Sequence, residues 1–146
     1  MRGVYMVAAE LASLGLIVSP TSRSAAGADL LVTDEDCSNA YSVQVKTNAK
    51  AAHFWLVGVR AEKISSPSHV YVFVNIRPRT KVHEYYIVPS RVVAKKMRVE
   101  ERRQSTWYVF FRKDAERYRD RWALLGAPAN RAMKRRGRTS NDSGTS

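Results

Sequence analysis

Three polar residues, Asp29, Gln44 and Lys46, have the types and spacing of a small reaction site. Asp29 begins one short apolar run, and Gln44 and Lys46 alternate with Val43 and Val45 in the next run. Because strand side chains alternate between the two faces of a sheet, Gln44 and Lys46 are expected to share one face. A carboxylate, an amide oxygen and an amine arranged in this way can hold a divalent cation and a water beside a phosphate. The pattern alone still favours a simpler interpretation, a half-buried antiparallel hairpin whose outer face is polar.

The N-terminal residues predict the elements that position this hairpin. Apolar side chains recur at helical spacing over residues 1–14, and Gly15 is a natural end for such a helix. Glu10 lies at the edge of the apolar stripe, so its carboxylate can point toward the hairpin or toward water. A short strand at 16–19 and a polar loop at 20–27 then lead into Asp29.

Further apolar runs predict a mixed sheet flanked by helices. Strands are expected at residues 28–32, 41–47, 53–59, 70–76 and 84–88, with a strand or core segment at 107–111. Ser90 is expected to cap a short helix, and Asp114 a second helix that ends at Leu125. The charged run 98–106 between these helices is expected to be a loop.

The expected fold class is therefore α/β, in the order helix, three strands, then further strands and helices. Residues 1–126 are expected to form a single domain. Residues 127–146 lack apolar periodicity and carry five basic side chains and one acidic one, which predicts a flexible basic tail.

The net charge of +12 is distributed unevenly. Residues 1–49 hold three basic and five acidic side chains, whereas residues 50–126 hold 17 basic and seven acidic ones. A polyanion, and in particular nucleic acid, is therefore the expected partner, and it should meet the second half of the chain. The candidate phosphate contacts are polar or basic residues of predicted loops and helix surfaces: Ser22, Arg23, Ser24, Arg77, Arg79, Lys95, Lys96, Arg102 and Arg103.

Other classes of site find little support in the composition. Cys37 is the single cysteine, so an internal disulfide and a cysteine-based zinc cluster are excluded, and the three histidines lack ligand spacing. The three tryptophans lie in apolar segments and are expected in the core. Glu10 interrupts the apolar N-terminus, and no apolar run is long enough to span a bilayer, so we expect a cytoplasmic protein without membrane association.

The order of these motifs resembles the PD-(D/E)XK nuclease superfamily. The resemblance is carried by a helix with an internal Glu10, a strand, a G-x-D motif at Gly27 to Asp29 followed by three apolar residues, and Gln44-Val45-Lys46 15 residues after Asp29. It covers about residues 3–60, and it is greatest for small bacterial members that have QVK in place of EVK. The resemblance implies a restriction-endonuclease-like core and metal-dependent hydrolysis of phosphodiester bonds.

The resemblance also implies a role for each matching residue. Asp29 would bind one or two Mg2+ or Mn2+ ions, with the amide oxygen of Gln44, the Val45 carbonyl and Glu10 as further ligands. Lys46 would orient or deprotonate the attacking water. Gln44 has no charge where the family has a second carboxylate, and Glu10 lies later in its helix than the family's carboxylate, so we expect a more weakly held metal.

These expectations support three hypotheses of different classes. The first is a metal-dependent DNA endonuclease, and by analogy with dimeric nucleases of this fold a homodimer is expected. The second is a nucleic-acid-binding module that has kept the fold and lost the chemistry, with salt-sensitive binding and no turnover. The third is a protein-interaction domain, which would bind neither DNA nor a metal.

Overall fold

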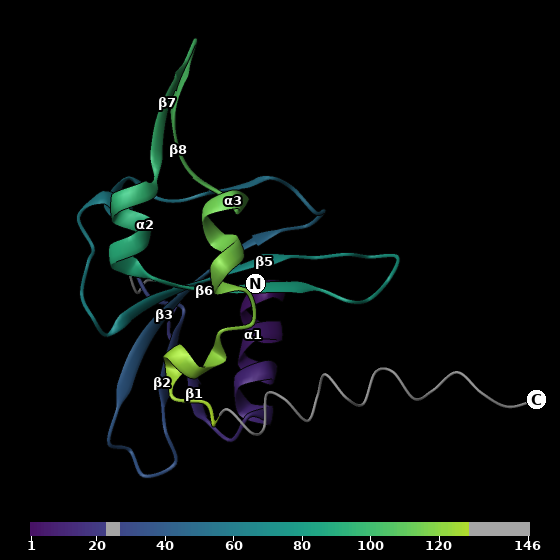
Figure 1. The fold of residues 1–146 in the computed structure, drawn as a ribbon, viewed down its shortest axis with the longest axis vertical. Helices are drawn as coiled ribbons and strands as arrows, with labels where there is room; N and C mark the ends of the chain where they lie inside the picture. The colour runs from purple at the N-terminus through teal and green to yellow at the C-terminus, as the bar shows by residue number, and fades with distance from the viewer. Residues whose placement is uncertain (23–26, 129–146) are drawn as a thin grey trace, which may run out of the picture.

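A central five-stranded sheet organises the computed structural model, which describes residues 1–22 and 27–128 (Figure 1). In spatial order its strands are β1 (Ile17–Pro20), β2 (Leu30–Thr33), β3 (Ala40–Asn48), β5 (His69–Asn75) and β6 (Glu84–Pro89). Neighbouring strands are antiparallel, except for β3 and β5, which are parallel. The mixed sheet and its flanking helices confirm the expected α/β class.

A second sheet carries a hairpin that projects from the body of the molecule (Figure 1). In spatial order its strands are β4 (Phe54–Leu56), β8 (Ser105–Phe111) and β7 (Arg98–Arg102). The prediction of a loop at 98–106 is therefore wrong, because this run forms β7 and the turn into β8. Most of this hairpin is exposed to water, so its sequence lacks the apolar alternation of a buried strand. The Arg102 guanidinium lies 3.8 Å from the centre of the Trp107 ring and covers its apolar surface.

One face of the central sheet is aliphatic and is covered by α1 (Arg2–Ser13). Val7 and Leu11 of α1 are completely buried against it, as the helical spacing predicts. Gly3 lies so close to Thr47 at the end of β3 that a side chain at position 3 would overlap the threonine. A glycine is therefore needed for the start of α1 to dock on β3.

The opposite face is aromatic and is covered by the second sheet and three short helices. These helices are η1 (Val59–Glu62), α2 (Ser90–Lys96) and α3 (Arg112–Ala115). The Trp55 ring centroid lies 5.0 Å from that of Phe73 and 5.4 Å from that of Tyr86. Its Nε1 donates a hydrogen bond of 2.9 Å to the Val74 carbonyl. Trp55 and Trp122 are therefore core residues, as expected, whereas Trp107 lies on the projecting hairpin and is only half-buried.

The helix predicted from Asp114 to Leu125 is wrong, because the chain there crosses from one face of the sheet to the other. The segment is divided into α3, η2 (Glu116–Tyr118) and η3 (Trp122–Leu125). Ala115 packs in the aromatic core, whereas Trp122 packs in the aliphatic core with α1. The chain turns at Asp120, which has a φ of 54° and donates its backbone N–H to the Tyr85 carbonyl at 2.9 Å. One straight helix could not reach both cores around β6.

Three further expectations about local structure also need correction. The run 53–59 is a strand only at β4, and the chain then turns into η1. Ser90 does not cap α2, because its buried hydroxyl donates a hydrogen bond of 3.0 Å to the Ser66 carbonyl. Asp114 lies inside α3 and does not cap it. Among the helices at 1–22 and 27–128, none has the length and apolar character needed to cross a bilayer.

Candidate active site

Asp29 lies at a fork where β2 separates from β3. The two strands pair from Leu30–Thr33 to Ala40–Val43, and after Val43 β3 continues in register with β5 alone. At the fork the Asp29 N–H donates to the Val43 carbonyl at 2.8 Å, and the Val45 N–H donates to Asp29 Oδ2 at 2.8 Å. Because the N–H and C=O of a strand residue point the same way, the Val45 carbonyl also faces the carboxylate side of the fork.

The register places Gln44 and Lys46 together on the aromatic face of the sheet. Val43 and Val45 are buried in the aliphatic core under α1, so their neighbours in β3 face the other way. Leu30 pairs with Val43 and is buried in that same aliphatic core, and Asp29, the residue before it, lies just outside β2 at the fork. Lys46 forms no ion pair with any carboxylate of the described chain, so its amine is not committed to a protein partner.

Three hydrogen bonds hold the segment that carries Asp29. The Thr21 hydroxyl donates to the Ala28 carbonyl at 2.6 Å, and the Thr21 N–H donates to the Asp29 carbonyl at 3.0 Å. His69 Nε2 lies 2.6 Å from the carbonyl oxygen of Gly27, which has a φ of 87°. Since a carbonyl only accepts, this ring nitrogen carries the proton. Sequence reasoning missed Thr21 and His69, because neither bond follows from spacing along the chain.

A hollow of about 160 Å³ adjoins Gln44 on the aromatic side of β3. Its lining joins β3 and β5 to the loop before Asp29 and to η1, and consists of Gly27, Gln44, Gly58, Val59, Arg60, Ala61, Ile64 and Tyr71. Tyr71 pairs with Gln44 in the parallel register, and Arg60 comes from η1. Neither residue could be assigned to this hollow from its spacing in the sequence, because only the β3–β5 pairing and the position of η1 bring them to Gln44.

Glu10 comes from the opposite layer to Gln44 and Lys46, because α1 covers the aliphatic face. It is half-buried at the edge of the stripe, and its backbone carbonyl accepts a hydrogen bond of 2.7 Å from the Ser13 hydroxyl. In the described ranges, no three histidine, cysteine, aspartate or glutamate side chains gather into a metal-binding group. Asp29 is therefore the carboxylate that the strand pairing itself places at the fork.

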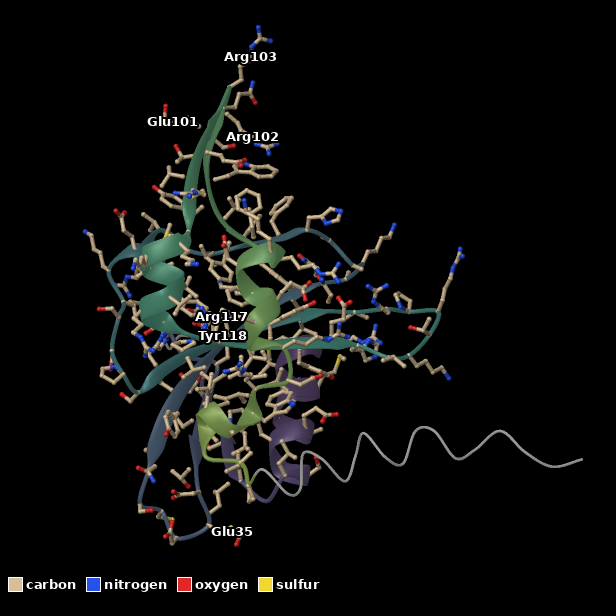
Figure 2. All side chains as sticks on the ribbon, in the orientation of Figure 1. Glu35, Glu101, Arg102, Arg103, Arg117 and Tyr118 are labelled. Atoms are coloured by element: carbon tan, nitrogen blue, oxygen red, sulfur yellow. The ribbon has the colours of Figure 1, made fainter. Side chains whose placement is uncertain are left out.

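The predicted phosphate contacts are scattered over the surface. The Arg77 guanidinium forms an ion pair with Glu84 Oε1 at 2.7 Å, and the Arg102 guanidinium lies 3.2 Å from Glu100 Oε2. Arg102 and Arg103 lie at the end of the projecting hairpin, at the opposite end of the molecule from Glu35 in the turn after β2 (Figure 2). Ser22, Arg79, Lys95 and Lys96 are exposed. Arg23, Ser24 and residues 129–146, which include most of the predicted tail, lie outside the described residues.

A second polar centre lies where β5 and β6 meet α3. Glu84 is buried and lies 2.7 Å from the Arg77 guanidinium and 3.2 Å from that of Arg112, while Asn75 donates to it at 3.3 Å. Burial alone raises the pKa of the Glu84 carboxyl, but hydrogen bonds from Arg77 and Asn75 and the charges of Arg112 and Arg77 outweigh it. The pKa therefore lies below its ordinary value. This centre joins the C-terminal segment to the central sheet.

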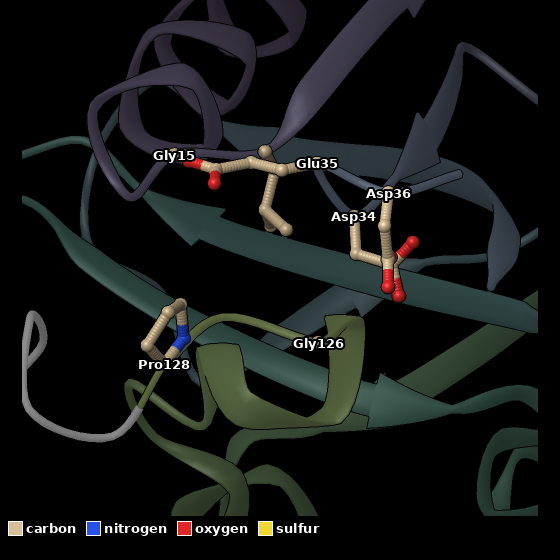
Figure 3. A pocket seen from close by; sticks show the side chains of 7 residues that line it. Gly15, Asp34, Glu35, Asp36, Gly126 and Pro128 are labelled. Carbon is tan, nitrogen blue, oxygen red and sulfur yellow. The ribbon is translucent and has the colours of Figure 1, made fainter. Parts of the chain in front are cut away.

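The turn between β2 and β3 borders a third site, an acidic hollow of about 360 Å³ (Figure 3). Asp34, Glu35 and Asp36 line it together with Pro128. The side-chain hydrogen bond from Asn39 is the largest of several that hold the pKa of Asp34 well below its ordinary value. Asp34 thus shapes its own turn, and the exposed Cys37 lies in the same turn with a φ of 57°.

Comparison with known proteins supports the fold. No protein-family model and no curated protein sequence matches the chain. Among solved structures, the chain is similar to Hjc, a Holliday junction resolvase from the archaeal hyperthermophile Archaeoglobus fulgidus. The TM-score is 0.51 at 10% sequence identity, over 80% of this chain and 89% of the resolvase chain. The chain therefore has a restriction-endonuclease-like fold.

Proposed function

We propose that the protein is a metal-dependent DNA endonuclease of the QVK type, which hydrolyses phosphodiester bonds at the fork between β2 and β3. The observation that carries this proposal is the position of Asp29. Its carboxylate accepts a hydrogen bond from the Val45 N–H, between Gln44 and Lys46, whose side chains share one face of the sheet. The likeness to a Holliday junction resolvase supports DNA as the substrate.

The residues at the fork fit a hard divalent cation. A carboxylate oxygen of Asp29, the Val45 carbonyl and the Gln44 amide oxygen would hold Mg2+ or Mn2+, whereas Glu10, which comes from the opposite layer, is left out of this ligand set. The bound ion would supply Lewis acidity and a more acidic water. Lys46 would orient that water and offset the charge that develops on the phosphate. With a neutral amide in place of a second carboxylate, binding of the metal should be weak.

Phosphate contacts on the rest of the surface complete the proposal. Arg79, Lys95 and Arg103 are exposed and form no ion pair with the described residues, so they are free to bind DNA backbone. Arg77, Lys96 and Arg102 already face a carboxylate and would contribute less. Ser22, Arg23 and Ser24, which precede Asp29 in the sequence, would contact phosphates of the DNA. A homodimer and a cytoplasmic location also belong to the proposal.

The test is a plasmid-nicking assay with Mg2+ and with Mn2+. We expect Asp29→Ala and Lys46→Ala to lose at least about a hundredfold in rate, as is typical when a group that activates the attacking water is removed. Asp36→Ala, an exposed aspartate in the turn after β2, is the matched control and should cut like the wild type. Mn2+ should also raise the midpoint of thermal unfolding of the wild type but not of Asp29→Ala. Cleavage that survives both site substitutions would contradict the proposal.

The single carboxylate of the strand pair favours a second candidate, a nucleic-acid-binding module without catalytic activity. This candidate predicts salt-sensitive DNA binding and no nicking with either ion. Asp29→Ala should then leave the affinity unchanged or raise it, because a negative charge is removed. A protein that binds neither DNA nor Mn2+ would support the third candidate, a protein-interaction domain.

A further inference from the structure

The hollow beside Gln44 is lined by three polar side chains that have no partner in the described part of the chain. The Gln44 amide and the Tyr71 hydroxyl form no hydrogen bond there, and the Arg60 guanidinium forms no ion pair. The three residues come from β3, β5 and η1, so their meeting depends on the tertiary structure. Arg60 is exposed and Gln44 is half-buried, so water can hydrogen-bond to both, whereas Tyr71 is buried and its hydroxyl is the group that a ligand in the hollow would satisfy.

Tyr71 gives the clearest sign that the hollow is built for a polar ligand. The residue is only 1% exposed, and its ring is stacked on Phe73 with centroids 5.6 Å apart. Among the described residues, the side-chain polar atom that is both inaccessible and without a hydrogen bond is His69 Nδ1. The Tyr71 hydroxyl has no hydrogen bond either, so it must be accessible, and Tyr71 lines the hollow. Burial raises the pKa of the Tyr71 phenol, which therefore keeps its proton and can donate it.

The charge and size of the hollow select a small anion. Arg60 contributes a positive charge, and no aspartate or glutamate belongs to the lining. The hollow offers about 160 Å³ of space. Pockets for whole organic ligands begin at about 300 Å³. A phosphate group fits this space.

We infer that the hollow is a phosphate subsite, which holds a phosphate of the nucleic-acid strand next to the phosphate that Asp29 faces. The assignment of that phosphate to a nucleic acid rests on the proposed function. Gln44 belongs to both sites, because its amide oxygen can face the metal while its NH2 group donates to the phosphate. A glutamate at this position could not donate and would repel the phosphate. The subsite therefore gives a physical reason for glutamine at position 44.

The subsite is tested by DNA binding without divalent ions, so that the readout does not depend on cleavage. The probe is a fluorescein-labelled DNA duplex in EDTA, followed by fluorescence anisotropy over a series of salt concentrations. Arg60→Ala should weaken binding roughly tenfold and lower the slope of log affinity against log salt by about one. Arg121→Ala, an exposed arginine at the start of η3, is the control and should change the affinity by less than about twofold.

Two more variants separate the subsite from general charge effects. Tyr71→Phe should weaken DNA binding several-fold, while its free energy of unfolding stays within about 10% of the wild type, because the hydroxyl has no partner to lose. Gln44→Glu should weaken DNA binding in EDTA and tighten binding of Mn2+. Inorganic phosphate, added to isotope-labelled protein, should shift the NMR signals of the Gln44 side-chain amide and of Arg60 Nε–H.

The outcomes separate this inference from the proposed function. Equal losses of affinity in Arg60→Ala and Arg121→Ala would overturn the subsite, even if Asp29→Ala abolished cleavage. A loss of DNA affinity in Arg60→Ala but not in Arg121→Ala, in a protein that never cuts DNA, would support the subsite and refute the endonuclease. If inorganic phosphate shifts both NMR signals and DNA does not displace it, the assignment of the bound phosphate to a nucleic-acid strand is overturned.

Discussion

Glu84→Gln is the substitution whose effect on stability the structure predicts most directly. The Glu84 side chain is 4% exposed, and its carboxylate faces two guanidinium groups, those of Arg77 at 2.7 Å and Arg112 at 3.2 Å. Glutamine has nearly the same shape but no charge, so both arginines would lose their buried counter-charge. Removing one partner of a fully buried ion pair costs about 3–5 kcal/mol. Because the two arginines are 40% and 25% exposed, water can replace part of the interaction, and we expect a loss of about 2–3 kcal/mol.

Urea unfolding, measured for wild type and variant at about pH 7, gives this loss directly. Glu100→Gln is the matched control, because Glu100 lies 3.2 Å from Arg102 in an exposed pair whose side chains are 38% and 51% accessible. Exposed pairs contribute about 0–1 kcal/mol, so this variant should unfold within about 0.5 kcal/mol of the wild type. Equal losses in the two variants would refute the argument from burial.

The pH dependence gives a second check on the same reasoning. The pKa of Glu84 is lower in the folded protein than its ordinary value of 4.5, so the unfolded chain binds the proton more readily. The contribution of Glu84 is therefore fully present above about pH 4.5 and is lost as the pH falls through the folded pKa. The difference between wild type and Glu84→Gln should shrink between about pH 5 and pH 3. A constant difference over this range would refute the assigned role of the carboxylate.

Two further predictions concern packing around the sheet. Gly3→Ala should destabilise the protein by about 1–3 kcal/mol, although alanine is the better helix former by about 1 kcal/mol, because its Cβ overlaps Thr47. Thr47→Gly in the Gly3→Ala background should recover part of the loss in urea unfolding, and an unchanged loss would exclude the overlap as its cause. Ser90→Ala should cost about 1 kcal/mol through the lost bond to the Ser66 carbonyl, and a variant as stable as the wild type would show that water replaces this bond.

Local sequence patterns predicted those parts of the fold in which each face of an element has one kind of side chain. The spacing of Val7 and Leu11 predicted α1, because one face of this helix is buried. β5 is buried on both faces, and the alternation of Tyr71 and Phe73 with valines predicted it because the two faces of a strand pack against different cores. The same reasoning failed for residues 114–125, whose apolar side chains are buried on opposite faces of the central sheet. It also failed at 98–106, where the projecting hairpin buries too little to leave a pattern.

The candidate site divides in the same way. Alternation along β3 alone placed Gln44 and Lys46 on one face, because the period of a strand is a local property of the backbone. The hydrogen bond from the Val45 N–H to Asp29 depends on the register of β2 and β3 and on the fork between them. Tyr71 lies next to Gln44 because β3 and β5 pair in parallel, and Arg60 lies near Gln44 because of the position of η1. Sequence periodicity carries no information about these contacts, because they depend on how elements that are distant in the chain pack together.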